Sequence, residues 1–263
     1  MFEKNVIDVS ENIFGGVRDK TFVVLTHKKH KREIYLERGN KEALKYIILK
    51  MKSFKKRLVY YSLSLGVLQP FLKKVKLNSN IGDVIFCGNQ IKAFNLKKRF
   101  VCSFPLTESK DTFIKSKINQ QIISLKGFAP KIRVNEPRGY SIDELVEDYE
   151  GTDEDAFKRI LEFYQVKKVL FEGKEYLITK IHGDFAKENI MIKNGKIMFV
   201  DWNLREGLIT SDLVNFFRSE NNLMKNERFL KLLKLYSIEV QENIEEYIKN
   251  DKIYKNERRY DKK

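Results

Sequence analysis

Three oxygen-bearing side chains stand close together in the second half of the chain. Asp184 and Asn189 lie five residues apart in one polar segment, and Asp201 follows Asn189 by twelve residues. Magnesium prefers hard oxygen ligands and is often held by one or two protein groups together with substrate phosphates. An Asn amide oxygen and an Asp carboxylate suit that role, and a further Asp can orient and deprotonate an acceptor hydroxyl. Each residue alone is also typical of an ordinary loop or helix cap, so the prediction of a phosphoryl-transfer site depends on the set.

A predicted hairpin brings these residues together. Two apolar-rich runs, residues 190–193 and 196–200, flank Asn194-Gly195. Asn-Gly between such runs is the strongest short signal for a two-residue hairpin. Because the hairpin folds the chain back on itself, we expect Asp201 to return close to Asn189.

The same residues resemble a known family. His182-Gly183-Asp184, four further residues, Asn189, and an apolar strand ending in Asp201-Trp202 are similar to the aminoglycoside phosphotransferase and choline kinase family. The resemblance implies that Asp184 is the catalytic base, that Asn189 and Asp201 bind magnesium, and that His182 organises the loop. It covers about residues 80–220 and is strongest around the catalytic loop.

The resemblance also implies the fold class. We expect an α+β, protein-kinase-like bilobal fold, with a small and mostly antiparallel β lobe and a compact helical lobe. The predicted parts are a basic N-terminal α/β extension (1–75), the small lobe and hinge (76–150), the helical catalytic lobe (151–249) and a charged tail (250–263). The extension either forms a domain of its own or builds onto the small lobe. Ser211-Asp212-Leu213 resembles a later Asp-Leu of the family, which has a structural role.

The segment before the catalytic loop has the pattern of a kinase small lobe. Strands are predicted at residues 83–87, 90–94 and 99–104, and they are followed by a helix with apolar positions from Phe113 to Leu125. The acidic and aromatic connector at 145–151 then resembles a hinge. This places Glu147 and Tyr149 among the expected nucleotide-binding residues. An acidic run at 152–155 is predicted to open a helix that extends to about Phe171.

The expected phosphate-binding lysine departs from the family pattern. Members of the family carry a Lys in the third strand, which pairs with a Glu on the next helix. Alignment on Phe104-Pro105-Leu106 puts Ser103 at the Lys position and Gln120 at the Glu position. Loss of both partners together is physically reasonable, because one unpaired buried charge is costly. Lys92 or Lys98 could supply the cation instead.

Two further residue sets are candidates for phosphate contacts. Gly88-Asn89 lies between two predicted strands, where glycine permits close approach of the backbone to phosphates, although any hairpin can have such a turn. Lys187 lies inside the catalytic loop and either neutralises the transferred phosphate or is an ordinary solvated lysine.

The chain is strongly basic, with a net charge of +15. Residues 1–75 hold 17 Lys and Arg against 7 Asp and Glu, an excess of ten positive charges. A basic surface attracts an anionic membrane, an anionic glycan or nucleic acid, although lysine-rich composition alone gives the same count. A helical pattern from Lys41 to about Leu65 leads into an uncharged stretch from Leu58 to Leu72, which either lies on a membrane surface or packs on its own domain. No recognised nucleic-acid motif is found, so nucleic acid is not the expected partner.

The remaining composition favours a cytoplasmic protein. Cys87 and Cys102 fall in apolar, strand-like runs typical of buried thiols, and neither a signal peptide nor a membrane-spanning run is expected. A peripheral position at the inner membrane face remains an alternative.

The functional hypothesis is an ATP- and magnesium-dependent phosphotransferase with a hydroxyl acceptor on a small molecule, a sugar or a glycolipid. The short segment between hinge and catalytic loop favours an open cleft and therefore a large or lipid-linked acceptor. One alternative is a kinase-like protein that binds nucleotide without turnover. The other is a basic module associated with membrane or nucleic acid.

Overall fold

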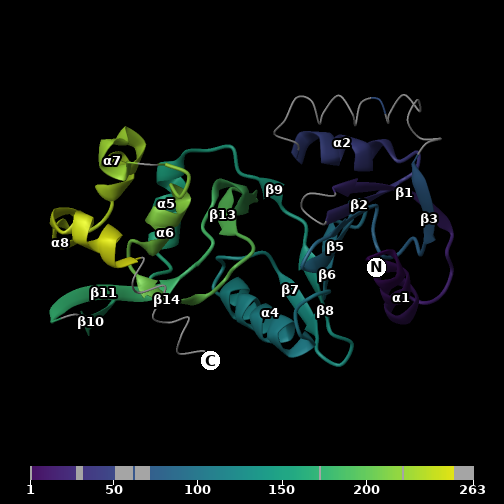
Figure 1. The fold of residues 1–263 in the computed structure, drawn as a ribbon, viewed down its shortest axis with the longest axis horizontal. Coiled ribbons are helices and arrows are strands. Elements are labelled where there is room, and N and C mark those ends of the chain that lie inside the picture. The colour runs from purple at the N-terminus through teal and green to yellow at the C-terminus, as the bar shows by residue number, and fades with distance from the viewer. Residues whose placement is uncertain are drawn as a thin grey trace. The chain divides into compact units, whose positions relative to one another are not determined.

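The computed structural model has an α+β architecture and contains two compact units (Figure 1). Unit 1 comprises Met1–Gln121 and Lys131–Leu145, and unit 2 comprises Ile122–Pro130 and Val146–Lys263. The structure describes residues 2–27, 32–50, 62, 72–171, 173–220 and 222–251. The predicted α+β, kinase-like fold class is confirmed.

An eight-stranded sheet forms the framework of unit 1. Its order is β3-β1-β2-β4-β5-β6-β8-β7, and each neighbouring pair is antiparallel. The strands are β1 Lys20–His27, β2 Arg32–Glu37, β3 Lys73–Leu77, β4 Val84–Cys87, β5 Gln90–Asn95, β6 Phe100–Pro105, β7 Ile132–Asn135 and β8 Tyr140–Glu144. Because β2 pairs with β4, the first strands of the chain continue the same sheet as the strands that follow residue 80.

Helices cover both faces of this sheet. Helix α1 (Phe2–Phe14) buries Val6 against a cluster that contains Phe22 and Tyr35. Helix α2 (Lys41–Lys50) buries Ala43 and Ile47 in a different cluster, which includes Val23. Helix α4 (Lys110–Leu125) runs beside β7 and β8 (Figure 1).

The long helix predicted from Lys41 is described only over its first part. Asn40 caps α2, since its side-chain oxygen accepts a hydrogen bond from Ala43 N at 3.0 Å. Residues 51–61 and 63–71 lie outside the described residues, and so does most of the predicted apolar stretch.

Unit 2 combines helices with two small sheets. The sheets have the orders β10-β11-β14 and β13-β12-β9. The strands are β9 Glu147–Asp148, β10 Lys167–Phe171, β11 Lys174–Ile181, β12 Ile190–Lys193, β13 Lys196–Phe199 and β14 Arg205–Leu208. The helices are α5 Asp153–Leu161, η3 Lys187–Asn189, α6 Ser211–Phe216, η4 Leu223–Lys225, α7 Glu227–Leu233 and α8 Ile238–Glu242.

The helix after the connector is shorter than predicted. Helix α5 ends at Leu161, and after a short connection Lys167–Phe171 form strand β10. Strand β10 pairs with β11, so tertiary pairing outweighs the helical pattern at this position.

The predicted Asn-Gly hairpin is confirmed. Strands β12 and β13 pair in the register Ile190↔Phe199 to Lys193↔Lys196. The φ angles of Asn194 and Gly195 are 48° and 74°, and two positive values are those of the favoured two-residue turn.

Both cysteines are buried thiols, as predicted. Cys87 and Cys102 are free and lie in the core that faces α1. Burial raises the pKa of each thiol to about 12, so neither forms a reactive thiolate at neutral pH.

The first two residues of the predicted charged tail pack against unit 2. Asn250 donates a hydrogen bond to the hydroxyl of Tyr176 at 2.5 Å, and Asp251 accepts one from Ser211. Residues 252–263 lie outside the described residues. Within the described part of the chain, no helix is both long enough and apolar enough to cross a membrane.

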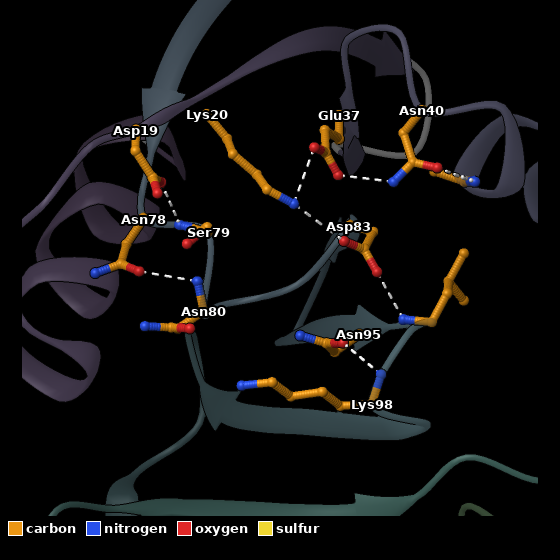
Figure 2. A network of polar contacts seen from close by, with 12 residues as sticks. Asp19, Lys20, Glu37, Asn40, Asn78, Ser79, Asn80, Asp83, Asn95 and Lys98 are labelled. Atoms are coloured by element: carbon orange, nitrogen blue, oxygen red, sulfur yellow. Dashed lines mark hydrogen bonds and ion pairs between the residues drawn. The ribbon is translucent and has the colours of Figure 1, made fainter.

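A polar network joins the strand ends of unit 1 (Figure 2). The Lys20 ammonium lies 2.9 Å from a Glu37 carboxylate oxygen and 3.5 Å from Asp83 Oδ1. The other oxygen of the buried Asp83 accepts a hydrogen bond from Leu96 N at 2.7 Å. This one carboxylate therefore holds β1 against the turn that follows β5.

We expect Asp83→Ala to lower the free energy of unfolding by about 2–3 kcal/mol, because it leaves the part-buried Leu96 N–H without its acceptor and removes one of the two carboxylates beside the Lys20 ammonium. The matched control is Asp19→Ala, which removes an exposed carboxylate that accepts a hydrogen bond from Ser79 N. Its expected cost is below about 1 kcal/mol. Urea denaturation measures both, and equal losses would contradict the assigned role of Asp83.

Candidate functional site

One buried carboxylate holds the start of the catalytic loop. Asp212, at the N-terminal end of α6, is fully buried. Its Oδ2 accepts hydrogen bonds from His182 N at 2.7 Å and from the Tyr164 hydroxyl at 2.9 Å, and its Oδ1 accepts one from Gly183 N at 3.0 Å. Burial, followed by the charge of Asp212, raises the pKa of Tyr164 well above its usual range. Tyr164 therefore remains a donor, and the loop starts from a fixed position.

His182 links this loop to the end of the hairpin. Its buried ring donates from Nε2 to the Val200 carbonyl at 2.9 Å, and Nδ1 accepts from Asp184 N at 3.4 Å. Burial lowers the pKa of His182, which favours the neutral ring. The two partners then assign the Nε2–H tautomer. The ring also packs on Trp202, with centroids 4.5 Å apart.

Gly183 is required by a close backbone approach. Its φ angle is +82°, and a Cβ at this position would lie 2.2 Å from the carbonyl oxygen of Asn203. Asn203 N in turn donates to the His182 carbonyl at 2.9 Å. The segment after Asp201 is thereby held directly against the catalytic loop.

Asn189 and Asp201 are brought together by the hairpin. Val200 N donates to the Asn189 carbonyl at 3.0 Å, which extends the strand pairing by one residue, and Asp201 follows immediately. Asn189 Nδ2 donates to the Asp184 carbonyl at 2.8 Å, so its Oδ1 is the atom directed to other partners. Asp201 is exposed and has a φ angle of 57°. A non-glycine residue in this left-handed region is uncommon and is often found at functional sites.

The donor set suits magnesium. An amide oxygen and a carboxylate are hard ligands, and magnesium normally takes its remaining ligands from phosphates and water. Among the described residues there is no group of three or more His, Cys, Asp or Glu side chains that could hold a metal alone. Asn189 and Asp201 therefore fit a magnesium ion that arrives with a nucleotide better than an all-protein metal centre.

The carboxylate of Asp184 is half-exposed and has a cationic neighbour. Arg218, which follows α6, donates from Nη1 to Asp184 Oδ1 at 2.9 Å. The two side chains are 59% and 48% exposed, so the pair contributes little to stability and leaves the second carboxylate oxygen accessible. Arg218 is not predictable from the sequence, because no spacing rule connects residues 34 positions apart.

Lys187 is exposed, and its ammonium lies 4.0 Å from Asp153 Oδ1. Arg228 also binds the Asp153 carboxylate. The structure therefore places Lys187 in an ion cluster at the start of α5.

The connector residues Glu147 and Tyr149 lie beside the hairpin. Strand β9 pairs with β12 through Ile192↔Glu147, and Tyr149 N donates to the Ile190 carbonyl at 3.3 Å. The connector thus runs along the strand that starts immediately after Asn189. Burial, followed by the charge of Asp155, raises the pKa of Tyr149.

The other predicted nucleotide-binding residues lie in unit 1. Gly88 and Asn89 form the turn between β4 and β5, and a Cβ on Gly88 would meet no atom within 4 Å. The Asn89 carbonyl accepts from Leu106 N and Thr107 N, each at 3.1 Å. Ser103 lies on β6, is fully buried, and its Oγ has no hydrogen-bond partner.

Comparison with known proteins assigns the family. The sequence profile of the ecdysteroid kinase-like family matches residues 89–248, more than half of the chain. The chain belongs to the ecdysteroid kinase-like family. The matched region begins at the turn between β4 and β5 and includes the whole catalytic loop.

Family membership places the chain in the protein-kinase-like superfamily related to choline kinase. It also implies a kinase-like phosphotransferase that acts on small molecules. The narrower resemblance to aminoglycoside phosphotransferases is not confirmed. No curated protein and no solved structure gave a significant match.

We expect Gly183→Ala to destabilise unit 2 by about 3 kcal/mol or more, since it adds a backbone collision to the cost of a positive φ. The matched control is Gly195→Ala. Gly195 also has a positive φ angle, but its added Cβ would meet no atom within 4 Å, so only about 1–2 kcal/mol should be lost. Chemical denaturation measures both variants, and similar losses would contradict the close approach of Asn203.

His182 should make stability depend on pH. Its pKa in the folded protein lies below the ordinary value of 6.5, so below that pH the unfolded chain binds a proton that the native state excludes. The contribution is fully present above pH 6.5 and is lost as pH falls toward the folded pKa, at up to about 1.4 kcal/mol per pH unit. The measurement is chemical denaturation of the wild type and of His182→Asn at several pH values between about 5 and about 8, on both sides of the ordinary histidine pKa. An unchanged pH slope in the variant would contradict this assignment.

Proposed function

We propose that this protein is an ATP- and magnesium-dependent phosphotransferase whose acceptor is a hydroxyl group on a small molecule, a sugar or a glycolipid. The observation that carries the proposal is the common anchoring of Asp184, Asn189 and Asp201. Asn189 donates to the backbone of Asp184, and Val200, next to Asp201, is bonded to both Asn189 and His182. Such an arrangement has a clear chemical use in phosphoryl transfer, which depends mainly on positioning and electrostatics.

Asp184 is proposed to act on the acceptor. One carboxylate oxygen is engaged by Arg218, and the other is available to accept a hydrogen bond from the hydroxyl. A carboxylate in that position orients the hydroxyl for attack and takes its proton as the new bond forms. The guanidinium of Arg218 keeps positive charge close to the transferred group.

Asn189 Oδ1 and the Asp201 carboxylate are proposed to hold magnesium. When bound, the ion would neutralise charge on the nucleotide phosphates. The hydrogen bond from Asn189 Nδ2 to the Asp184 carbonyl fixes the amide so that its oxygen, not its nitrogen, is presented. The hairpin keeps the second ligand at a constant distance from the first.

The remaining predicted residues have auxiliary roles in this proposal. Gly88 and Asn89 cover the phosphates, and Glu147 and Tyr149 border the adenine. Lys187 contacts the transferred phosphate only if it leaves its ion pair with Asp153.

The acceptor and its location also remain proposals. Between the connector and the catalytic loop the described chain holds only α5, β10 and β11, which leaves few residues to enclose an acceptor. This favours a large or lipid-linked acceptor over a small enclosed one. The basic N-terminal part would then assist by attracting an anionic membrane or glycan at the inner membrane face.

A second candidate function is nucleotide binding without turnover. It is favoured by Ser103, which stands where the family that the chain resembles has a lysine on the third strand of the small lobe. The retained Asp184, Asn189 and Asp201 favour the enzyme, because a protein that only binds has little physical need for all three.

The test is a thermal-shift titration with ATP in the presence and absence of magnesium. At 100 times the dissociation constant, a ligand specific to the native state stabilises it by about 2.7 kcal/mol. We expect ATP to stabilise the wild type only with magnesium, Asp201→Asn to lose this response and Asp184→Asn to keep it. The matched control, Asp153→Asn, removes a nearby carboxylate and should keep it as well. No ATP response in the wild type, or an intact response in Asp201→Asn, would contradict the proposal.

A further inference from the structure

A charged pair inside unit 1 has no role in the function described so far. Lys117 projects from α4, and its ammonium lies 3.3 Å from Asp143 Oδ2 on β8 and 3.4 Å from Gln120 Oε1. The Lys117 side chain is 5% exposed and that of Asp143 is 15% exposed. Burial of two charges is costly and does not by itself stabilise a fold compared with apolar residues of similar size. The pair therefore calls for a functional reason.

The sheet beneath Lys117 carries polar atoms without partners. Ser103 pairs with Ser141 in the β6–β8 register, and Val101 pairs with Asp143. Since alternate residues of a strand share a face, Ser103, Ser141 and Asp143 lie on the same face of the sheet. Both serines are fully buried, and neither hydroxyl has a hydrogen-bond partner. The second oxygen of Asp143 is likewise unpartnered.

Buried polar atoms are almost always hydrogen-bonded, so this group is unusual. The two serine hydroxyls can each donate a hydrogen bond, and the Lys117 ammonium has three N–H donors, of which Asp143 and Gln120 engage two. The chemistry that satisfies them together is an anion with several oxygen atoms. A phosphate of a nucleotide has that chemistry.

We propose that Lys117 is the phosphate-binding cation of this protein, and that Asp143 positions it. In the aminoglycoside phosphotransferase and choline kinase family that the chain resembles, the cation lies on a strand and its carboxylate partner lies on the following helix. Here the cation is on helix α4 and the carboxylate is on the sheet, so the charge pair is present with its two members exchanged. This inference rests on the proposed function and names the residue that binds the α- and β-phosphates in it.

The exchange changes how Ser103 and Gln120 are interpreted. Ser103 cannot supply a cation, and its buried hydroxyl has no hydrogen-bond partner. Gln120 lies one helical turn after Lys117 and accepts a hydrogen bond from its ammonium, so it helps to hold the ammonium beside Asp143. The Lys–Glu pair expected at positions 103 and 120 is absent, but in this proposal Lys117 and Asp143 supply the cation and its carboxylate partner from other positions.

Lys92 is the competing candidate. It lies on β5 directly opposite Ser103 and therefore on the same face of the sheet. Lys117 is proposed because Asp143 and Gln120 hold its buried ammonium in place, which reduces the side-chain entropy lost when a phosphate binds. The two candidates differ in which lysine the ATP probe should label and in which variant should lose affinity for Mg·ADP.

The first experiment uses the wild-type protein and an ATP acyl-phosphate probe. A lysine amine beside the phosphates attacks the acyl carbon. An amide bond forms, the mixed anhydride breaks, ATP leaves and a proton passes to solvent. Mass spectrometry of digested protein should find the label on Lys117 and should show that excess Mg·ATP prevents it. Protected labelling of Lys92 instead of Lys117 would overturn the inference.

The second experiment measures affinity by calorimetry with Mg·ADP and with adenosine. The variant Lys117→Met/Asp143→Leu removes both charges and keeps similar side-chain volume, which is often tolerated by a fold. We expect its affinity for Mg·ADP to fall about 10- to 100-fold, the range for loss of a charged hydrogen-bond donor, while its affinity for adenosine is unchanged. A structural defect would weaken both ligands equally and would overturn the inference.

Two single variants complete the design. Lys97→Met removes an exposed positive charge near the same strand and should leave both affinities unchanged. A loss for Mg·ADP in Lys92→Met, without a loss in the Lys117→Met/Asp143→Leu variant, would overturn the inference and assign the role to β5. If the wild type binds no Mg·ATP at all, the proposed function fails and this inference fails with it. If the wild type binds and the Lys117→Met/Asp143→Leu variant binds equally well, only this inference fails.

Discussion

The site of unit 2 depends on one buried carboxylate. Asp212 accepts two backbone N–H groups of the catalytic loop and one phenolic hydroxyl. The loop turns sharply at Gly183, where its peptide groups have no strand partner to satisfy them. A charged acceptor in the interior is costly, but three donors offset that cost, and the donors cannot move without being left unpaired. The position of the catalytic loop relative to α6 follows from this one group.

The remaining geometry extends outward from that anchor. The ring of His182 carries the constraint to Val200, and the hairpin carries it from there to Asn189. Aromatic packing then fills the space around the loop, with Phe185 in contact with Phe157 and Phe199. Asp201 lies outside this packing and has a left-handed backbone conformation. The backbone hydrogen bonds of Val200 and Asn203 hold the chain on either side of it. Rigid support on one side and an exposed carboxylate on the other are what a metal ligand requires.

The sequence allowed prediction of those features that depend on local residues. The Asn-Gly turn and its two strands follow from residue types within ten positions, so the proximity of Asn189 and Asp201 was predictable. The partner of Asp184 was not predictable in this way. Arg218 reaches Asp184 through tertiary packing, and the spacing of the two residues in the chain carries no signal. Strand β10 was predicted as helix because its pairing with β11 is not visible in the sequence.

The central claim is that this constellation transfers a phosphoryl group with Asp184 as the base. The most direct measurement is incubation of the purified protein with γ-labelled ATP, magnesium and a small-molecule and lipid extract, followed by separation of labelled products. We expect the wild type to label a small molecule or glycolipid, and we expect Asp184→Asn to reduce the initial rate by about 10²- to 10⁴-fold. Equal labelling by the wild type and by Asp184→Asn would contradict the account.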